Sequence, residues 1–279
     1  MNLNKNFVVE LFDSQWKISF LESEIANCPH YDIFHIFQKY ITRDKKVLEA
    51  GCGLGRWVFY FHRLGYNIVG IDWSQKTVDM LKAYDSNVKI FQGDIRKTNF
   101  KNEEFDVILS IGAVEHAIEG PENALSESFR ILKEDGILII TVTMLSLTRK
   151  ILNFFKDYLI IIKALFRGKY KELNLLKSNN IPDLYMNILF ENNSYNFFNY
   201  KFPLITFISY IKSAGFQILE TSIAFYEDGL YQDLGALVGN YDYNKGRFEK
   251  NIFGRILYKL FPKLFPHMIC CVAKKHNNK

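Results

Sequence analysis

Short apolar runs alternate with helical segments along the first half of the chain. Gly65 ends one of these segments, and Pro121 opens another after Gly120. The apolar runs occupy residues 47–50, 66–71, 88–92, 105–110 and 137–143. Such alternation predicts an α/β fold with a doubly wound parallel sheet, and right-handed crossovers would bring the strand ends to one edge. We therefore expect the functional site at that edge.

A glycine-rich turn follows the first apolar run. Glu49 lies two residues before Gly51, and the sequence continues as Gly51-Cys52-Gly53-Leu54-Gly55. Glycines let a backbone turn sharply and approach a ligand closely, and a helix start offers free N–H groups to an anion such as a carboxylate. The G-x-G-x-G spacing differs from the dinucleotide fingerprint, and Glu49 would repel a pyrophosphate. S-adenosylmethionine, which carries an ammonium and a sulfonium but no phosphate, suits the acid better.

Polar residues follow the later runs in an order that supports this interpretation. Asp72 ends the second run about 20 residues beyond the turn, where a ribose-binding acid is expected, and one carboxylate can accept from both ribose hydroxyls. The third run leads into Gly93-Asp94-Ile95, and the fourth into Ile111-Gly112-Ala113-Val114-Glu115-His116. Each residue alone could be ordinary turn or cap chemistry. The ordered set is more specific than any one member.

On these residues the chain resembles class I S-adenosylmethionine-dependent methyltransferases, over roughly residues 45–143 and weakly after residue 203. The series is similar to a subgroup that includes ubiquinone, menaquinone, glycan and natural-product methyltransferases. The resemblance implies a Rossmann-like sheet of seven strands, mostly parallel with the last antiparallel, and S-adenosylmethionine as cofactor. It also implies that Asp94 faces the adenine amino group and that Ile95 lines the ring. The predicted cofactor-binding residues are Glu49, Gly51, Cys52, Gly53, Gly55, Trp57, Asp72, Trp73, Gly93, Asp94, Ile95, Ser110, Ile111 and Gly112.

The predicted organisation is a core with a cover and an insertion. The methyltransferase core would comprise residues 41–144 and 203–279, with a helical cover over the cofactor at residues 1–40 and a helical cap over the acceptor site at residues 145–202. Within the cover, Trp16 is either a cofactor contact or a core ring. After residue 203 we expect a helix to Ala214, a strand over 216–223 and a final strand over 267–274.

Two apolar and basic segments have two interpretations each. Residues 147–166 have the spacing of a helix with a wide apolar face, which would either cap the substrate pocket or contact a membrane surface. Residues 248–266 would pack on the sheet as the last crossover helix, or contact a membrane as well. Between residues 145 and 180, eight Lys or Arg face two acids, and this local charge of +6 exceeds the net +5 of the 279-residue chain. The positive charge is therefore concentrated in one element.

Composition adds limits to this picture. A hydrophobic fraction of 48% is sufficient for a buried core, and the four cysteines show no C-x-x-C spacing. The first residues lack a basic region followed by a sustained apolar stretch, so we expect no secretory signal. These features predict a cytoplasmic protein with reduced thiols, peripheral at the inner face of a membrane if the apolar segments bind there. We predict no resident metal, and the oligomeric state is left open.

His116 is the candidate catalytic residue, because it follows the fourth run and histidine has a suitable pKa for a general base. It could instead only hydrogen-bond a loop. Glu115, His116 and Glu119 are a weaker candidate set of cation ligands. Tyrosines of the insertion could line an acceptor pocket; they are Tyr170, Tyr185, Tyr195 and Tyr200.

The sequence thus predicts a methyltransferase that modifies a small-molecule, sugar or lipid-linked acceptor, most simply at oxygen. The first alternative is an RNA or protein methyltransferase that docks through the basic insertion. Against it, Ser110-Ile111-Gly112-Ala113 stands where enzymes that methylate base or amide nitrogens commonly carry Asn/Asp-Pro-Pro-Tyr/Phe. The second alternative is a non-catalytic module that only binds the cofactor.

Overall fold

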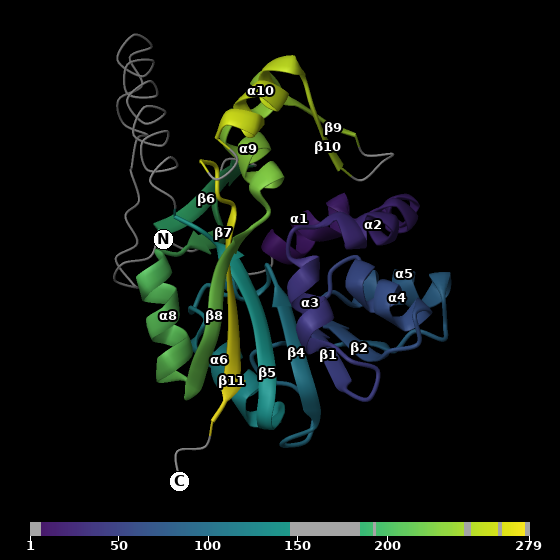
Figure 1. The fold of residues 1–279 in the computed structure, drawn as a ribbon. Coiled ribbons are helices and arrows are strands. Elements are labelled where there is room, and N and C mark those ends of the chain that lie inside the picture. The colour runs from purple at the N-terminus through teal and green to yellow at the C-terminus, as the bar shows by residue number, and fades with distance from the viewer. Residues whose placement is uncertain (1–6, 146–184, 192–193, 243–246, 262–263, 277–279) are drawn as a thin grey trace.

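Seven strands form one twisted sheet at the centre of the protein (Figure 1). The computed structural model describes residues 7–145, 185–191, 194–242, 247–261 and 264–276. In spatial order the strands are β3 (Ile90–Gln92), β2 (Asn67–Asp72), β1 (Lys46–Ala50), β4 (Phe105–Ile111), β5 (Leu132–Thr143), β11 (Met268–Lys275) and β8 (Phe216–Ala224). The first five are parallel, whereas β11 is antiparallel to both β5 and β8. The predicted seven-stranded, mostly parallel fold is confirmed.

Helices cover both faces of the sheet, which explains why its strands are apolar throughout. In β1, Val47 packs into one core cluster and Leu48 into the other. The first cluster lies under α2 (Leu21–Asn27), α3 (Phe34–Tyr40), α4 (Arg56–Arg63) and α5 (Gln75–Tyr84), and the second under α6 (Glu122–Ile131) and α8 (Leu204–Ser213). A parallel sheet buried on both faces requires continuous rather than alternating apolar runs. The expected helix after Pro203 and the expected strands that follow it are confirmed by α8, β8 and β11.

The end of the insertion is a β-hairpin, formed by β6 (Tyr185–Glu191) and β7 (Ser194–Lys201) (Figure 1). The prediction of a helical segment is therefore wrong for these residues, whereas residues 146–184, including the predicted helix over 147–166, lie outside the described residues. Aromatic side chains favour strands, and in β7 Phe197 and Tyr200 are buried in the second cluster. Asn199 also donates from Nδ2 to Thr143 Oγ1 at 3.2 Å, which joins β7 to the end of β5.

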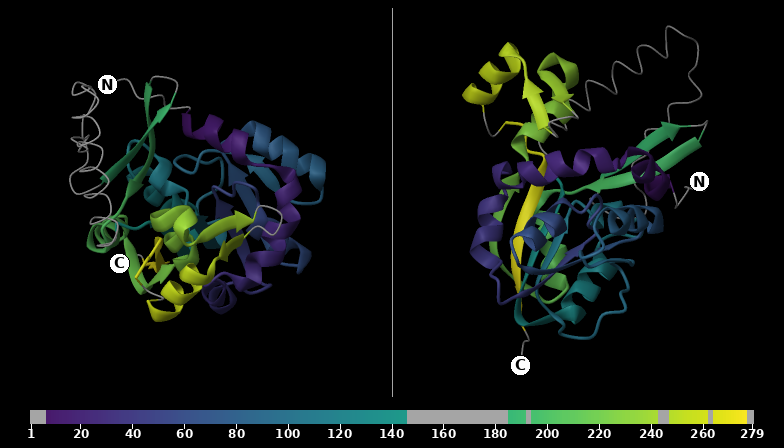
Figure 2. Two further views of the ribbon diagram at one scale, coloured as in Figure 1. Left: turned by 90° about the horizontal axis from the view of Figure 1, so that it is seen from above. Right: turned by 90° about the vertical axis from the view of Figure 1, so that its right-hand side faces the viewer.

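The C-terminal unit stands above the carboxyl edge of the sheet (Figures 1 and 2). It consists of α9 (Tyr226–Leu234), β9 (Gly239–Asp242), β10 (Arg247–Lys250) and α10 (Ile252–Leu260). Leu230 of α9 and Phe248 of β10 share a small core with Val238 and Phe265, which lie in adjoining segments. The expectation that residues 248–266 pack on the sheet is wrong, because α10 packs against α9 and β10. Antiparallel neighbours such as β8 and β11 can be joined at one edge without a crossover helix.

Gly254 sets how closely α10 approaches the rest of the C-terminal unit, because an added Cβ would overlap the carbonyl oxygen of Val238. We expect Gly254→Ala to loosen α10 at a cost of about 1–3 kcal/mol, as overpacking does elsewhere. Hydrogen exchange should then accelerate over residues 235–260 and stay unchanged in the sheet. Lys259→Ala, at an exposed position of the same helix, is the control. Equal exchange in both variants would contradict this packing.

Candidate functional site

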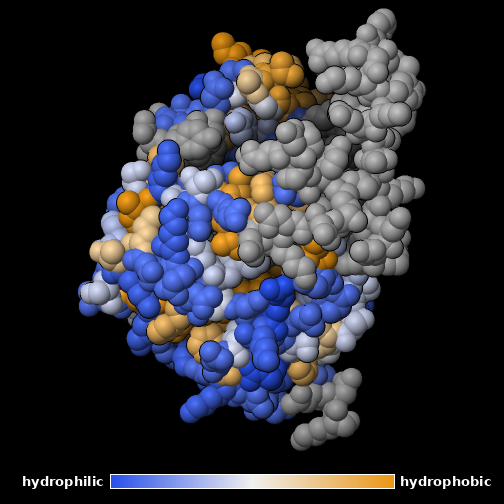
Figure 3. Space-filling model, turned by 180° about the vertical axis from the view of Figure 1, so that it is seen from behind, coloured by the Kyte–Doolittle hydropathy of each residue, from blue (hydrophilic) through white to orange (hydrophobic). Residues whose placement is uncertain are grey.

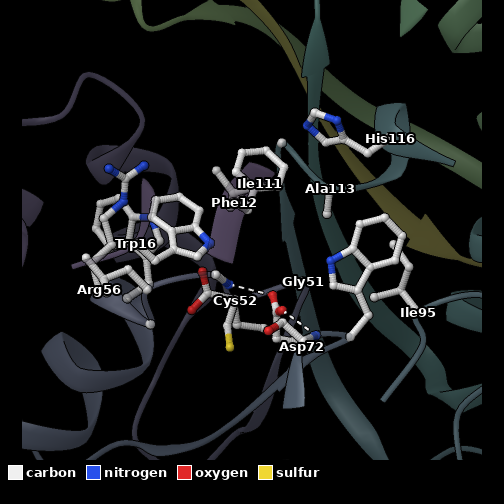
Figure 4. A pocket seen from close by; sticks show the side chains of 18 of the residues that line it. Phe12, Trp16, Gly51, Cys52, Arg56, Asp72, Ile95, Ile111, Ala113 and His116 are labelled. Carbon is white, nitrogen blue, oxygen red and sulfur yellow. Dashed lines mark hydrogen bonds between the residues drawn. The ribbon is translucent and has the colours of Figure 1, made fainter. Parts of the chain in front are cut away.

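A cavity of about 520 Å³ opens at the carboxyl edge of the sheet (Figure 4). Its walls come from the ends of β1, β2, β3 and β4, from α1 (Phe7–Gln15) with the residues after it, and from α9. Every predicted cofactor-binding residue except Ser110 lines this cavity, and so does His116. Successive strand side chains point to opposite faces, so Ser110 is buried within the sheet while Ile111 reaches the cavity.

The glycine turn forms the floor of the cavity and is fixed by β2. The N–H groups of Gly51 and Cys52 both donate to the carbonyl oxygen of Ile71 at 2.9 Å. The carboxylate of Asp72 accepts from Gly53 N at 2.8 Å and from Ser74 N at 3.0 Å. Gly51 has a φ of +81°, and an added Cβ would lie 2.5 Å from Ala113 Cβ. The turn therefore requires glycine for its conformation and for its close contact with the end of β4.

Glu49 lies at the base of the turn, almost fully buried. Its Oε2 accepts from Val58 N at 3.1 Å. Burial raises the pKa of Glu49 to about 8, against the opposing charge of Arg56. Burial also raises the pKa of Asp72. Because each shift reflects a carboxylate short of compensating charge, this end of the cavity favours a cationic ligand group.

Asp94 lines the cavity at the end of β3 and is held by an ion pair. Arg96 donates from Nε and Nη2 to the carboxylate of Asp94, and the shortest of these contacts is 2.6 Å, from Nη2 to Oδ2. Arg96 also donates from Nη1 to Glu119 Oε2 at 2.8 Å. Burial acts to raise the pKa of Asp94, but the hydrogen bonds from Arg96 outweigh it and hold this pKa below its usual value. Asp94 is therefore a fixed anion with remaining lone pairs for a donor such as an exocyclic amine.

Aromatic rings form the side of the cavity opposite the strand ends. Trp16 stacks on Phe12 with ring centroids 5.3 Å apart and lies over Gly53, whose added Cβ would be 3.1 Å from the indole. Trp16 is thus a cavity wall as well as a packed ring. Trp57, in contrast, is 1% exposed and packs edge-on against Phe37 at 4.7 Å, so most of its ring belongs to the core.

The structure adds lining residues that the sequence analysis did not single out. Arg56 donates from Nη1 to Glu24 Oε2 at 2.8 Å and to Tyr31 Oη at 2.9 Å. The sequence could have indicated this residue, because Arg56 directly follows Gly55 and therefore places a cation beside the turn. The α9 residues that line the cavity are Asp228, Tyr231 and Gln232. Burial raises the pKa of Asp228 to about 6, and no motif near these residues indicates a site.

His116 lines the cavity on the side opposite Arg56 (Figure 4). Its Nδ1 is 2.7 Å from the carbonyl oxygen of Phe198, and its ring meets the rings of Phe12 and Phe198 edge-on at 5.1 Å. A carbonyl can only accept, so Nδ1 carries the proton and Nε2 keeps a free lone pair. Burial lowers the pKa of His116 to about 4. The imidazole is therefore neutral at physiological pH.

The other candidate residues whose side chains the structure describes are engaged elsewhere. Glu115 accepts from Thr143 N and Oγ1 at 3.2 and 3.1 Å, and Glu119 pairs with Arg96. Within the described ranges, no three His, Cys, Asp or Glu side chains are grouped as metal ligands. Tyr200 is buried and donates to the carbonyl oxygen of Ile118 at 2.7 Å. Tyr170 lies outside the described residues.

Comparison with known proteins gives this arrangement a family. Residues 48–140, from β1 through most of β5, match the family described as a methyltransferase domain. The chain carries a class I S-adenosylmethionine-dependent methyltransferase domain. The resemblance inferred from the sequence and its implied cofactor, S-adenosylmethionine, are thereby confirmed.

The matches to individual relatives cover only part of this chain. The chain is 36% identical over 98 residues to a ubiquinone biosynthesis O-methyltransferase from Pelagibacter ubique, covering 34% of this chain and 40% of the relative. It is 29% identical over 149 residues to a sterol 24-C-methyltransferase from Pneumocystis carinii, covering 47% and 38%. A solved S-adenosylmethionine-dependent methyltransferase from Methanosarcina mazei shares the fold, with a TM-score of 0.57 at 14% identity over 86% of this chain and 97% of that one. The chain thus spans about two fifths of these two curated relatives.

The first prediction for the methyltransferase site concerns Gly51. We expect Gly51→Ala to abolish measurable binding of S-adenosylhomocysteine in calorimetry and to cost about 1–3 kcal/mol of stability, because it adds both a strained φ and a clash. Gly65→Ala shares the positive φ but has no atom within 4 Å of the added Cβ. This control should lose stability and keep its affinity. Loss of affinity in both variants would contradict a specific role for the turn.

The second prediction concerns the protonation of Glu49. With its pKa near 8, the carboxyl is protonated at pH 7 in the free protein. A ligand ammonium would lower this pKa, so binding of S-adenosylhomocysteine should release up to about one proton per site. Affinity should therefore rise with pH until about pH 8. Calorimetry in buffers of different ionisation enthalpy measures the release directly.

Glu49→Gln should bind without releasing this proton. Glu115→Gln is the control, because burial raises the pKa of Glu115 to about 7 although this residue does not line the cavity. The Glu115→Gln control should release as many protons on binding as the unmodified protein does. Release that persists in Glu49→Gln would assign the proton to another group.

Proposed function

We propose that the protein transfers a methyl group from S-adenosylmethionine to a hydroxyl oxygen of a small-molecule, sugar or lipid-linked acceptor. The observation that carries this proposal is the free Nε2 lone pair of His116 in the cavity that also holds the glycine turn and Glu49. Such a nitrogen can take a proton from an acceptor hydroxyl. Relatives named for sterol and ubiquinone methylation support small acceptors.

The lining residues match the cofactor group by group. Glu49 suits the ammonium and Arg56 the carboxylate of the methionine part, since a carboxyl that can ionise and a guanidinium line the cavity on either side of the glycine turn. Asp72 suits the ribose hydroxyls, because each of its oxygens keeps a lone pair after accepting one backbone N–H. Asp94, Ile95 and the indole of Trp16 provide an acceptor and apolar surfaces for the adenine.

When bound, S-adenosylmethionine supplies an electrophilic methyl group on a sulfonium. The residues around His116 then have two tasks, to orient the acceptor and to exclude water, and alignment alone can contribute about 7–11 kcal/mol. Phe12 and Phe198 both pack edge-on against the imidazole. The bond from Nδ1 to Phe198 fixes which nitrogen faces the acceptor. The acceptor oxygen would bond to the methyl carbon as the bond from that carbon to sulfur breaks and S-adenosylhomocysteine leaves, and Nε2 of His116 would take the hydroxyl proton.

The alternative functions gain no specific support. Docking of RNA or protein was inferred from the basic residues of 145–180, and all of these lie outside the described residues. A non-catalytic module would not need a neutral histidine with one free ring nitrogen at the acceptor end. Location in the cytoplasm stays a prediction.

Incubation of the protein with a cell extract and cofactor carrying a deuterated methyl group tests the transfer reaction. We expect mass spectrometry to find a labelled small molecule or lipid whose methyl ether survives mild base. Label on nucleic acid or protein, or no turnover despite cofactor binding, would contradict the proposal. The measurement also identifies the acceptor.

Replacement of His116 tests its role in the transfer. His116→Gln keeps a donor for the Phe198 carbonyl but removes the base, so we expect kcat to fall about 10²- to 10⁴-fold while binding of S-adenosylhomocysteine is unchanged. Since the pKa of His116 is near 4, its titration should not affect the unmodified enzyme above about pH 5. The activity attributed to this base should be lost only as pH falls towards 4.

The control for His116 is His35→Ala. His35 also hydrogen-bonds a backbone carbonyl through Nδ1, that of Asp32 at 2.6 Å, but it is exposed and outside the cavity. Its replacement should leave kcat unchanged. Full activity of His116→Gln would remove the histidine from the chemistry.

A further inference from the structure

Helix α10 turns an apolar face to solvent. Ile252, Phe253, Ile256 and Leu260 are 78%, 57%, 52% and 65% exposed. Ile252, Ile256 and Leu260 recur every four residues and therefore share one side of the helix. The other side packs inward through Gly254, which meets the backbone of Val238. Figure 3 shows a hydrophobic patch at the end of the molecule where α10 lies in Figure 1.

Basic side chains border this apolar face. Arg255 and Lys259 lie one turn apart on α10, both exposed, and the helix contains no acidic residue. Arg255 Nε donates to the carbonyl oxygen of Lys250 at 3.0 Å, which holds its guanidinium at the edge of the face. The nearby acid Glu227 is paired with Lys250 Nζ at 2.5 Å. We call Ile252, Phe253, Arg255, Ile256, Lys259 and Leu260 the α10 face.

The α10 face continues onto a neighbouring turn, and its helix packs on an element that lines the cavity. Leu237 is 71% exposed, and its carbonyl oxygen accepts from Asn251 Nδ2 at 3.0 Å, just before α10 begins. Beneath α10 lies α9, whose Asp228 and Tyr231 line the cavity. A surface on which α10 rests would therefore lie on the outer side of the unit that supplies this wall of the cavity.

We propose that the α10 face binds the surface of a bilayer that contains anionic phospholipid. Apolar side chains on the outward side of a helix, bordered by Arg or Lys, favour a helix lying in the plane of the headgroups, with its apolar face in the acyl boundary. None of the described helices is long and apolar enough to cross the bilayer, so this contact would be shallow. Use of the surface to collect a lipid-soluble acceptor rests on the proposed function, whereas binding itself does not.

A second copy of the chain fits the α10 face less well. In a symmetric contact, Arg255 and Lys259 of both copies would face the same small apolar area, and like charges at a desolvated interface oppose association. Anionic headgroups instead neutralise both residues, with each basic group near the surface adding to the attraction. The charge pattern therefore favours the lipid surface.

Flotation with vesicles tests the proposal on the whole chain, without cofactor or acceptor. The unmodified protein should float with vesicles of phosphatidylcholine and phosphatidylserine at about a 2:1 ratio and stay unbound with phosphatidylcholine alone. The double variant Ile252→Ser/Ile256→Ser should partition at least about tenfold less, because it removes buried apolar area on the membrane. Lys259→Glu should weaken binding and reduce its salt sensitivity.

Ile205→Ser is the matched control, since Ile205 is 82% exposed on α8, which lies beside β8 and away from α10 in Figure 1. It should float like the unmodified protein, and every variant should still bind S-adenosylhomocysteine. Failure of the folded protein to bind anionic vesicles, or equal binding by the double variant, would overturn the proposal. Self-association in sedimentation that the double variant abolishes would assign the face to a second copy. Binding with no methyl transfer in any extract would overturn only the proposed function.

Discussion

The clamp between β2 and the glycine turn is the constraint on which the rest of the site depends. One carbonyl, that of Ile71, and one carboxylate, that of Asp72, together hold the N–H groups of Gly51, Cys52 and Gly53. These bonds fix the start of α4, and with it Arg56, and they leave Glu49 enclosed below the turn. The unfavourable burial of a carboxyl is thereby built into a rigid frame, so that the group gives up its proton when a cationic ligand group binds beside it.

The central fold could be predicted because its signals are local. Continuous apolar runs indicate strands that are buried on both faces, and Val47 and Leu48 show this by packing into opposite cores. The positions of Glu49, Asp72 and Asp94 followed from the rule that parallel strands carry ligands at their carboxyl ends. Ser110 was misplaced since strand alternation, rather than motif membership, decides which side chain reaches the cavity.

The parts that sequence could not predict depend on contacts between distant segments. No motif near Asp228 indicates that α9 lines the cavity, because that role follows from where β8 and β11 end. The ion pair between Arg96 and Asp94 could be identified only from the structure, since an arginine two residues away could equally point to solvent. The β6–β7 hairpin was mistaken for helix because apolar and polar residues there follow no clear period.

The C-terminal unit has a core of its own, so the wall it gives the cavity is structurally separable from the floor. Substitutions around Leu230 or Phe248 can reshape α9 without disturbing the bonds between Gly53 and Asp72. A change within this unit would therefore alter one wall of the cavity while the glycine turn beneath it keeps its shape.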